Sequence, residues 1–250
     1  MFKDILNKWL RKSGWSISKE HAPFEHRKYK RIIGESWVDD LSRLIEFNKV
    51  QRVFDIGANE GQSSQRYLQL FPQAHIDAFE PNPRIFRQLE TCFDQVERVT
   101  THNVGVGKKE GKLPFQINRQ SVMSSFVNLG QYGWGDIVDT IDVSVIRLDE
   151  FWAKNEVIDF VKIDTQGFDS EVLCGLDGLI KKGMVQSVLI ETTFQELYQS
   201  RSRYWEIFQF MDSHQFQLIG FYDIHSDRSG IRWCDTLFVA KSILSESDDV

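Results

Sequence analysis

The sequence has few cysteines and no long apolar run. Its three cysteines, Cys92, Cys174 and Cys234, are widely spaced and form no C-x-x-C pair. An odd and scattered set of this kind does not suggest a disulfide framework, and it indicates reduced, buried thiols. No apolar stretch approaches the length of a membrane span, and no signal-peptide core is present. We therefore expect a cytoplasmic protein without a membrane span.

The sequence also lacks an excess of positive charge. Thirty basic residues stand against 36 acidic ones, which gives a formal net charge of −6. Because phosphate binding depends on clustered Lys and Arg, nucleic acid is not expected as the main partner. A chain of 250 residues that is 41% hydrophobic can bury one substantial core. We expect one catalytic domain over residues 49–242, an N-terminal helical extension over 1–48 and a polar tail over 243–250.

A glycine-containing turn at residues 53–62 is the strongest local signal. A short apolar run containing Asp55 stops at Gly57, and Gly61 precedes a helical pattern over 62–70. This is typical of a ligand-binding turn between a parallel strand and a helix N-terminus. A dinucleotide fingerprint would place its middle glycine at Asn59. The acids Asp55 and Glu60 instead favour a cation that carries hydroxyls, such as S-adenosylmethionine.

An acid at the end of the next predicted strand strengthens this interpretation. Residues 75–79 are strand-like, and Glu80 and Pro81 follow directly, about 25 residues after the glycine turn. A carboxylate at a strand tip accepts hydrogen bonds from both ribose hydroxyls, and proline prevents the strand from continuing. Glu80 is therefore a predicted cofactor-binding residue.

Five segments in this order resemble the motifs of the FkbM-type S-adenosylmethionine-dependent methyltransferases: residues 53–61, 79–82, 103–107, 161–167 and 190–191. The resemblance covers roughly residues 50–240. It implies an α/β, Rossmann-like class I methyltransferase fold, with a seven-stranded, mostly parallel sheet, an antiparallel last strand and helices on both faces. It also implies methylation of a hydroxyl on a sugar, glycan or natural product. One departure is visible, because Gln166 stands where the family commonly has glutamate.

The resemblance assigns the remaining cofactor contacts. In methyltransferases of this shape the tip of the third strand lies beside the adenine, which implies roles for Asn103 and Val104. Together with Asp55, Gly57, Asn59, Gly61, Glu80, Pro81 and Asp164 they form the predicted cofactor-binding set.

Hydrophobic periodicity places the other elements. Strands are predicted at 99–106, 143–148, 159–163, 185–190, 216–222 and 236–240, and helices at 37–45, 83–93, 151–154, 169–182 and 204–214. A short β-turn insertion is predicted near 111–115. Residues 118–136 break the alternation with serines, glycines and aromatics, which suggests either a lid over the site or a surface loop whose aromatics enter the core.

Three residues are candidates for the general base that takes a proton from an acceptor hydroxyl. Asp164 and Glu191 follow predicted parallel strands, whose carboxyl ends meet at the ligand crevice. Asp164 has an equally good interpretation as the anchor of the cofactor's ammonium group. His225 is the third candidate, because imidazole titrates near neutral pH. Asp164, Asp169 and Glu191 match no metal-binding spacing, so no metal is expected.

Two other functions remain open at this point. A nicotinamide-dependent oxidoreductase is disfavoured by Asn59, and a non-catalytic interaction module of the same fold is disfavoured by the intact polar set. The first residues also form a basic amphipathic pattern with Phe2, Ile5 and Trp9, which suits peripheral membrane or partner contact as well as packing on its own domain. A small-molecule or glycan acceptor is the expected partner, and an oligomer is compatible with the sequence.

Overall fold

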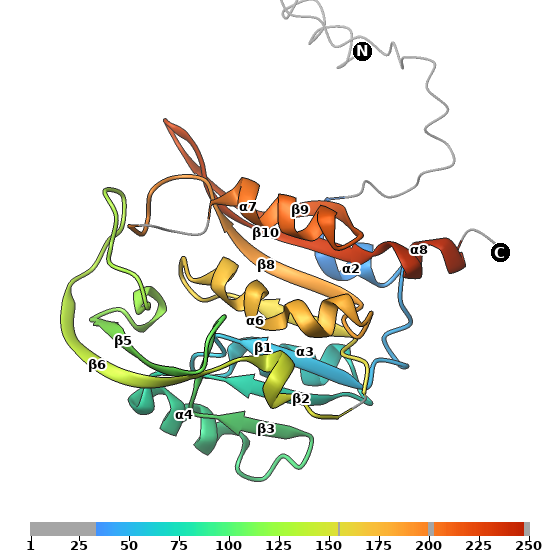
Figure 1. Cartoon of the computed structure of the whole chain (residues 1–250), viewed down its shortest axis with the longest axis horizontal. Helices are drawn as coiled ribbons and strands as arrows, with labels where there is room; N and C mark the ends of the chain where they lie inside the picture. The colour runs from blue at the N-terminus through green and yellow to red at the C-terminus, as the bar shows by residue number, and fades with distance from the viewer. Residues whose placement is uncertain (1–33, 155, 200–202, 248–250) are drawn as a thin grey trace, which may run out of the picture. The chain divides into compact units, whose positions relative to one another are not determined.

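Strands and helices alternate along most of the chain (Figure 1). The computed structural model describes residues 34–154, 156–199 and 203–247, so the predicted N-terminal amphipathic helix lies outside the described residues. The elements are α2 (Trp37–Leu41), β1 (Arg52–Ile56), α3 (Gln62–Leu70), β2 (His75–Phe79), α4 (Pro83–Phe93), β3 (Val99–His102), β4 (Gly105–Val106), β5 (Gly111–Asn118), η1 (Ser121–Met123), β6 (Ile137–Ile146), α5 (Leu148–Phe151), β7 (Phe160–Ile163), α6 (Asp169–Lys181), β8 (Ser187–Thr193), α7 (Tyr204–Ser213), β9 (Phe216–Asp227), β10 (Gly230–Ala240) and α8 (Lys241–Ser247).

The main sheet has seven strands in the order β3-β2-β1-β7-β8-β10-β9. Strands β3, β2, β1, β7 and β8 are parallel, and β10 is antiparallel to both of its neighbours. This arrangement confirms the predicted sheet, including its antiparallel last strand. The chain reverses direction along the sheet at β1, so the carboxyl ends of β1 and β7 flank a topological switch point, where α/β folds bind ligands.

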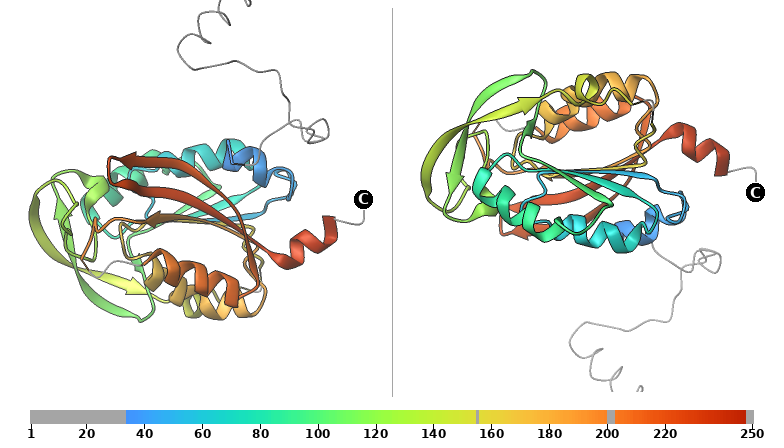
Figure 2. Two further views of the ribbon diagram at one scale, coloured as in Figure 1. Left: turned by 90° about the horizontal axis from the view of Figure 1, so that it is seen from above. Right: turned by 90° about the horizontal axis from the view of Figure 1, so that it is seen from below.

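Helices cover both faces of the sheet, as Figure 2 shows. Alternate residues of a strand point to opposite faces. Val53 of β1 accordingly packs in a buried cluster with Trp37 of α2 and with Phe71, which directly follows α3. Phe54 packs in a second cluster with residues of α6 and α7, such as Leu173. The predicted extension therefore contributes α2 to the core of the domain. Helix α8 crosses the boundary predicted at 242/243.

A second sheet of three strands, ordered β4-β6-β5, was not predicted. The strand predicted at 99–106 divides at residues 103–104, because Gly105–Val106 leaves the main sheet and pairs with β6. The predicted β-turn insertion near 111–115 is wrong, since β5 continues to Asn118 and pairs antiparallel with β6. Strands β9 and β10 also extend through residues 223–235, which lie between the strands predicted at 216–222 and 236–240. Their hairpin turns at residues 228–229.

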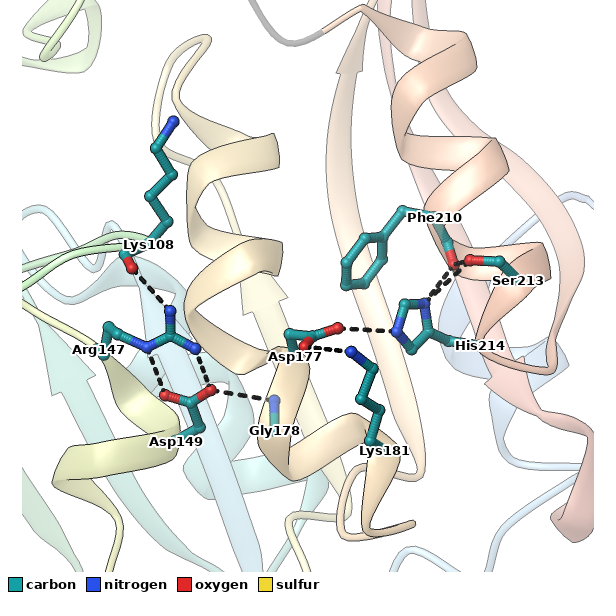
Figure 3. A network of polar contacts seen from close by, with 9 residues as sticks. All are labelled: Lys108, Arg147, Asp149, Asp177, Gly178, Lys181, Phe210, Ser213 and His214. Carbon is teal, nitrogen blue, oxygen red and sulfur yellow. Dashed lines mark hydrogen bonds and ion pairs between the residues drawn. The ribbon is translucent and has the colours of Figure 1, made fainter.

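Polar contacts hold α6 between its neighbours (Figure 3). Arg147 donates two hydrogen bonds to Asp149, which accepts a third from the backbone N–H of Gly178 on α6. On the other side of the helix, Asp177 pairs with His214, at the end of α7, at 2.9 Å. Since only residues 164–168 separate α6 from the end of β7, these contacts fix one end of the segment that follows β7.

Candidate functional site

The glycines of the β1–α3 turn make room for neighbouring parts of the protein. Gly57 has φ +85°, and a Cβ atom there would lie 2.0 Å from the backbone oxygen of Asp164. Gly61 has φ +96°, and a Cβ atom would lie 2.5 Å from the ring of Phe93 on α4. Both positions require glycine for conformation and for space. At both positions the space next to the glycine is filled by protein atoms, whereas the sequence suggested the close approach of a ligand.

A cleft opens above this turn, at the carboxyl ends of β1, β2 and β7. It has about 810 Å³ of empty space, which includes space open to solvent. Residues from four parts of the chain line it: Gly57, Ala58, Asn59, Gln62, Ser63, Glu80, Pro81, Asn82, Ile85, Phe115, Ser121, Val122, Ser124, Phe126, Asp164, Thr165 and Gln166. Five residues of the predicted cofactor-binding set are therefore together in one cleft.

Glu80 is the buried acid of the cleft wall. Its two carboxylate oxygens accept hydrogen bonds from the backbone N–H groups of Asn59, at 3.0 Å, and Asn82, at 2.8 Å. Burial raises the pKa of Glu80 to about 7, although these two bonds oppose the shift. Each oxygen keeps a lone pair that further hydroxyl donors can use. Asn103 lies outside the lining set, and its amide instead donates to the backbone oxygens of Glu80 and Pro81.

Asn59 offers a test of whether the cleft fits S-adenosylmethionine. It adopts a left-handed conformation, with φ 49°. This conformation directs its backbone N–H to Glu80, while its side-chain Oδ1 is buried without a hydrogen-bond partner among the described residues. A buried acceptor without a donor is costly. The ribose hydroxyls and ammonium group of S-adenosylmethionine are donors, so the donor-poor pair of Asn59 and Glu80 fits this cofactor.

Asp55 lies beneath the turn. It is 1% exposed and accepts a hydrogen bond from the Ser64 hydroxyl on α3 at 2.5 Å. Burial raises its pKa to about 6. It is not among the residues that line the cleft, so it supports the turn from below. Val104 is also outside the lining set, and it packs against the core beside α6.

Asp164 and Glu191 meet through one side chain, that of Gln166. The Gln166 amide nitrogen donates to Asp164 Oδ1 at 2.6 Å and to Glu191 Oε2 at 3.3 Å. Its amide oxygen accepts a hydrogen bond from the Tyr198 hydroxyl at 2.5 Å. An ionised glutamate at position 166 could not donate a hydrogen bond to either acid. Glutamine at this position, where the family commonly has glutamate, therefore fits the two neighbouring carboxylates.

Burial and the neighbouring charge of Asp164 raise the pKa of Glu191 well above its usual range. Glu191 is half-buried and lies within β8, which continues to Thr193, so it does not stand at the strand tip as predicted. It is not among the residues that line the cleft. Of the two acids, only Asp164 is among the residues that line the cleft.

A buried lysine completes this group and was not singled out from the sequence. Lys162 is 5% exposed, and its ammonium nitrogen lies 3.2 Å from Asp235 and 3.4 Å from Asp164. Burial lowers the pKa of Lys162, but the surrounding negative groups, first among them these two carboxylates, together raise the pKa well above its usual range. The sequence did contain a signal for Lys162, because it lies two residues before Asp164 and alternate residues of a strand share a face.

His225 lies away from the cleft. It sits on β9, which is three strands from β7 in the sheet, so about 14 Å separates the two strands. Its ring stacks on Trp233 of β10, with centroids 4.4 Å apart. The structure therefore groups Asp164 with Glu191 and places His225 elsewhere.

The 118–136 segment forms a fixed wall of the cleft. Ser125 exchanges two backbone hydrogen bonds with Gln116 of β5, and its hydroxyl donates to the backbone oxygen of Gln166. Farther along, Gly130 N–H donates to Leu197 O. The side chain of Phe126 packs on core residues, so the interpretation of aromatics entering the core applies to it. The wall residues were missed because their pairing with distant segments leaves no local pattern.

Neither a group of potential metal ligands nor a membrane-spanning helix is found among the described residues. Within residues 34–154, 156–199 and 203–247, no three His, Cys, Asp or Glu side chains are grouped so that they could hold a metal ion. Across the same part of the chain, no helix has both the length and the apolar character needed to span a membrane.

Comparison with known proteins gives a family match. The family model described as "Methyltransferase FkbM domain" matches residues 55–218. The 2-O-methyltransferase NoeI of Sinorhizobium fredii (strain NBRC 101917 / NGR234) is 27% identical over 162 residues, which cover 60% of this chain and 66% of that protein. The match thus spans slightly less than two thirds of this curated relative.

Solved structures of low similarity were also found. Aeropyrum pernix fibrillarin in complex with S-adenosyl-L-methionine has a TM-score of 0.47 at 12% identity, over 78% of this chain and 69% of that one. Magnesium protoporphyrin IX methyltransferase from Synechocystis PCC 6803, with bound S-adenosylmethionine, has a TM-score of 0.45 at 11% identity, over 95% and 96% of the two chains. Because both TM-scores are below 0.5, the assignment of a family rests on the sequence match.

Proposed function

The chain belongs to the FkbM methyltransferase family, and from this premise we propose that it transfers the methyl group of S-adenosylmethionine to a hydroxyl of a sugar, glycan or natural product. The observation that carries the proposal is the cleft, which has an acid at each side of the glycine turn, Glu80 from β2 and Asp164 from β7. The similarity to NoeI, a 2-O-methyltransferase, supports oxygen as the atom that is methylated.

Two of the acids bind the cofactor and a third accepts the proton. Glu80 binds the ribose hydroxyls, and Asp164 binds the ammonium group. S-adenosylmethionine, when bound, supplies an activated methyl group for in-line displacement, so the protein has to orient the acceptor and remove its proton. Glu191 is the proposed base. Burial and the charge of Asp164 raise its pKa, which makes it a stronger proton acceptor than an exposed glutamate.

Gln166 links these two roles. Its amide holds the carboxylates of Asp164 and Glu191 within 3.3 Å of one nitrogen, which keeps the proton acceptor beside the cofactor anchor. Lys162 forms an ion pair with Asp164, with 3.4 Å between the ammonium nitrogen and the carboxylate. These contacts give the anchor and the base different surroundings, which is how neighbouring carboxylates come to serve different functions.

Cofactor binding is tested by calorimetry with S-adenosylmethionine and, in parallel, with NADH. We expect binding of the first and none of the second. A chain that binds NADH and not S-adenosylmethionine would contradict the proposal.

The two acids have different kinetic signatures. Asp164→Asn is expected to raise the KM for S-adenosylmethionine, whereas Glu191→Gln is expected to lower kcat by roughly 10²-fold or more with little change in KM. Methyl transfer from radiolabelled cofactor to a panel of sugars and natural-product alcohols provides the measurement, and slow hydrolysis of the cofactor is the substitute. Glu90→Gln, an exposed acid on α4, is the matched control. A Glu191→Gln enzyme with full kcat would remove Glu191 from the role of base.

A further inference from the structure

Four side chains outside the cleft form an interleaved group near the end of the β9–β10 hairpin. His225 and Trp233 are parallel, with ring centroids 4.4 Å apart and an interplanar angle of 14°. Trp134, from the segment between η1 and β6, lies 5.4 Å from Trp233. The guanidinium carbon of Arg232 lies 5.2 Å from the ring centroids of both tryptophans. We call His225, Trp233, Trp134 and Arg232 the aromatic stack.

The aromatic stack shares a face of the sheet with the proposed base. On β10, Trp233 and Asp235 are two residues apart, and they pair with Thr193 and Glu191 of β8. Directly paired residues and residues two apart along a strand point to the same face. A continuous row thus runs from Glu191 to Trp233 and on to His225, which pairs with Trp233 on β9.

Packing joins the aromatic stack to the cleft wall as well. Trp134 and Trp233 pack against the buried cluster that contains Tyr198. The hydroxyl of Tyr198 donates to Gln166, which lines the cleft. Arg232 donates to the backbone oxygen of Tyr132, so the hairpin and the 118–136 segment lie side by side at the same end of the molecule (Figures 1 and 2).

The aromatic stack offers ring surface beside polar atoms. His225 is exposed, and the neighbouring Gln195 Oε1 is buried without a hydrogen-bond partner among the described residues. Arg232 Nε forms an ion pair with Asp227 Oδ2 at 3.7 Å. The Gln195 amide nitrogen donates to Asp227 and Ser229, at the turn of the hairpin. A purely apolar ligand leaves Gln195 Oε1 unsatisfied. A sugar places its C–H face on an aromatic ring and its hydroxyls on nearby polar groups, so it matches this mixture.

We propose that the aromatic stack is an acceptor subsite for an oligosaccharide. The sugar that is methylated lies at Asp164 and Glu191, and a neighbouring sugar of the same chain lies against the aromatic stack. From β7 to β10 the sheet spans two strand spacings, about 10 Å, and two further residues along β10 add ~7 Å. One sugar ring does not cover this distance. The inference rests on the proposed function and narrows its acceptor to a glycan.

An array of defined oligosaccharides, probed with the full chain in the presence of S-adenosylhomocysteine, identifies the bound glycan. Four variants are then compared on that oligosaccharide and on its terminal monosaccharide: His225→Ala, His225→Phe, Trp134→Ala and, as a matched control, Trp205→Ala. Trp205 is 43% exposed on α7 and also has an arginine over its ring, at 4.9 Å. Calorimetry with S-adenosylmethionine is run on every variant.

We expect His225→Ala and Trp134→Ala to raise the KM for the oligosaccharide by roughly tenfold, the scale of a lost aromatic contact. The KM for the monosaccharide, cofactor affinity and the Trp205→Ala control stay unchanged. His225→Phe keeps a ring on Trp233 and restores the oligosaccharide KM, whereas a base at position 225 is not restored by phenylalanine. Unchanged oligosaccharide KM values in the two alanine variants overturn the subsite.

An array without binding, combined with methyl transfer to a non-sugar alcohol, also overturns the subsite and leaves the proposed function intact. Loss of S-adenosylmethionine binding in the unmodified chain contradicts the proposed function instead.

Discussion

Replacing Glu80 by glutamine tests the cofactor site with the smallest change of shape. The wild-type carboxylate accepts one backbone hydrogen bond on each oxygen, from Asn59 at 3.0 Å and from Asn82 at 2.8 Å. Glutamine offers only one oxygen, and its NH₂ group then faces one of these N–H donors. The substitution therefore leaves a buried donor unsatisfied and removes an acceptor from the ribose.

The magnitude follows from these two losses. An unsatisfied buried donor costs about 1–3 kcal/mol of folding free energy, and a lost hydrogen bond to a charged group costs ~1.5–3 kcal/mol of binding free energy. We expect S-adenosylmethionine affinity to fall roughly 10- to 150-fold in a protein that still folds. Calorimetry measures the affinity and thermal unfolding measures the stability. A folded Glu80→Gln protein with unchanged affinity would remove Glu80 from the site.

The same residue predicts a pH dependence. The pKa of Glu80 in the folded protein is about 7, above its ordinary value of 4.5, so the folded state binds more protons than the unfolded state between these values. Its contribution to stability therefore falls as pH rises through this window. Ribose hydroxyls favour the ionised carboxylate, so cofactor binding releases about half a proton at pH 7 and strengthens from pH 6 to 8. Glu80→Gln is expected to abolish the proton release from this group.

Two further predictions concern the folding of the site. Gly57→Ala puts a Cβ atom 2.0 Å from a backbone oxygen at the tip of β7, and we expect it to destabilise the protein by several kcal/mol in denaturant unfolding. Gly183→Ala, with φ +68° and no atom within 4 Å, is the control that costs only about 1 kcal/mol of backbone strain. Asp149→Asn should cost about 1.5–3 kcal/mol of stability, because it removes the charged acceptor of a guanidinium and of the α6 backbone. The exposed ion-pair acid Asp136, 74% exposed, is its control, and Asp136→Asn should leave the unfolding midpoint unchanged.

The parallel sheet and the cleft at its edge were predictable because their signals are local. Gly57 directly follows β1, Pro81 is the second residue after β2, and Asp164 directly follows the buried strand β7. Parallel strands have their carboxyl ends at one edge of the sheet, so residues that directly follow the strands lie near one another whatever the conformation of the loops. Glu80, Asn59 and Asp164 are accordingly found in one cleft.

The acceptor side was less predictable because long-range pairing creates it. Gln166 attracted attention only as a departure from a family motif, and its role depends on Tyr198, 32 residues away. Trp134 and Trp233 come from segments about 100 residues apart and meet only in the folded protein. The 118–136 segment has no periodicity that reveals its backbone bonds to residues 196–199.

This difference follows from what sets the spacing of each half of the site. Strands β2 and β7 both pair with β1, so Glu80 and Asp164 stand two strand spacings apart, about 10 Å, and contact between Gly57 and the Asp164 backbone fixes the edge between them. The sheet itself thus sets the distance between Glu80 and Asp164, and a fold-level pattern is enough to predict that these two acids meet at one edge. The proposed acceptor side combines the end of the β9–β10 hairpin with a connecting segment and one glutamine, and the last two lie outside the strands of the main sheet. Under the proposed function, changes there alter the acceptor and leave Glu80 and Asp164 in place, which is how one fold serves many acceptors.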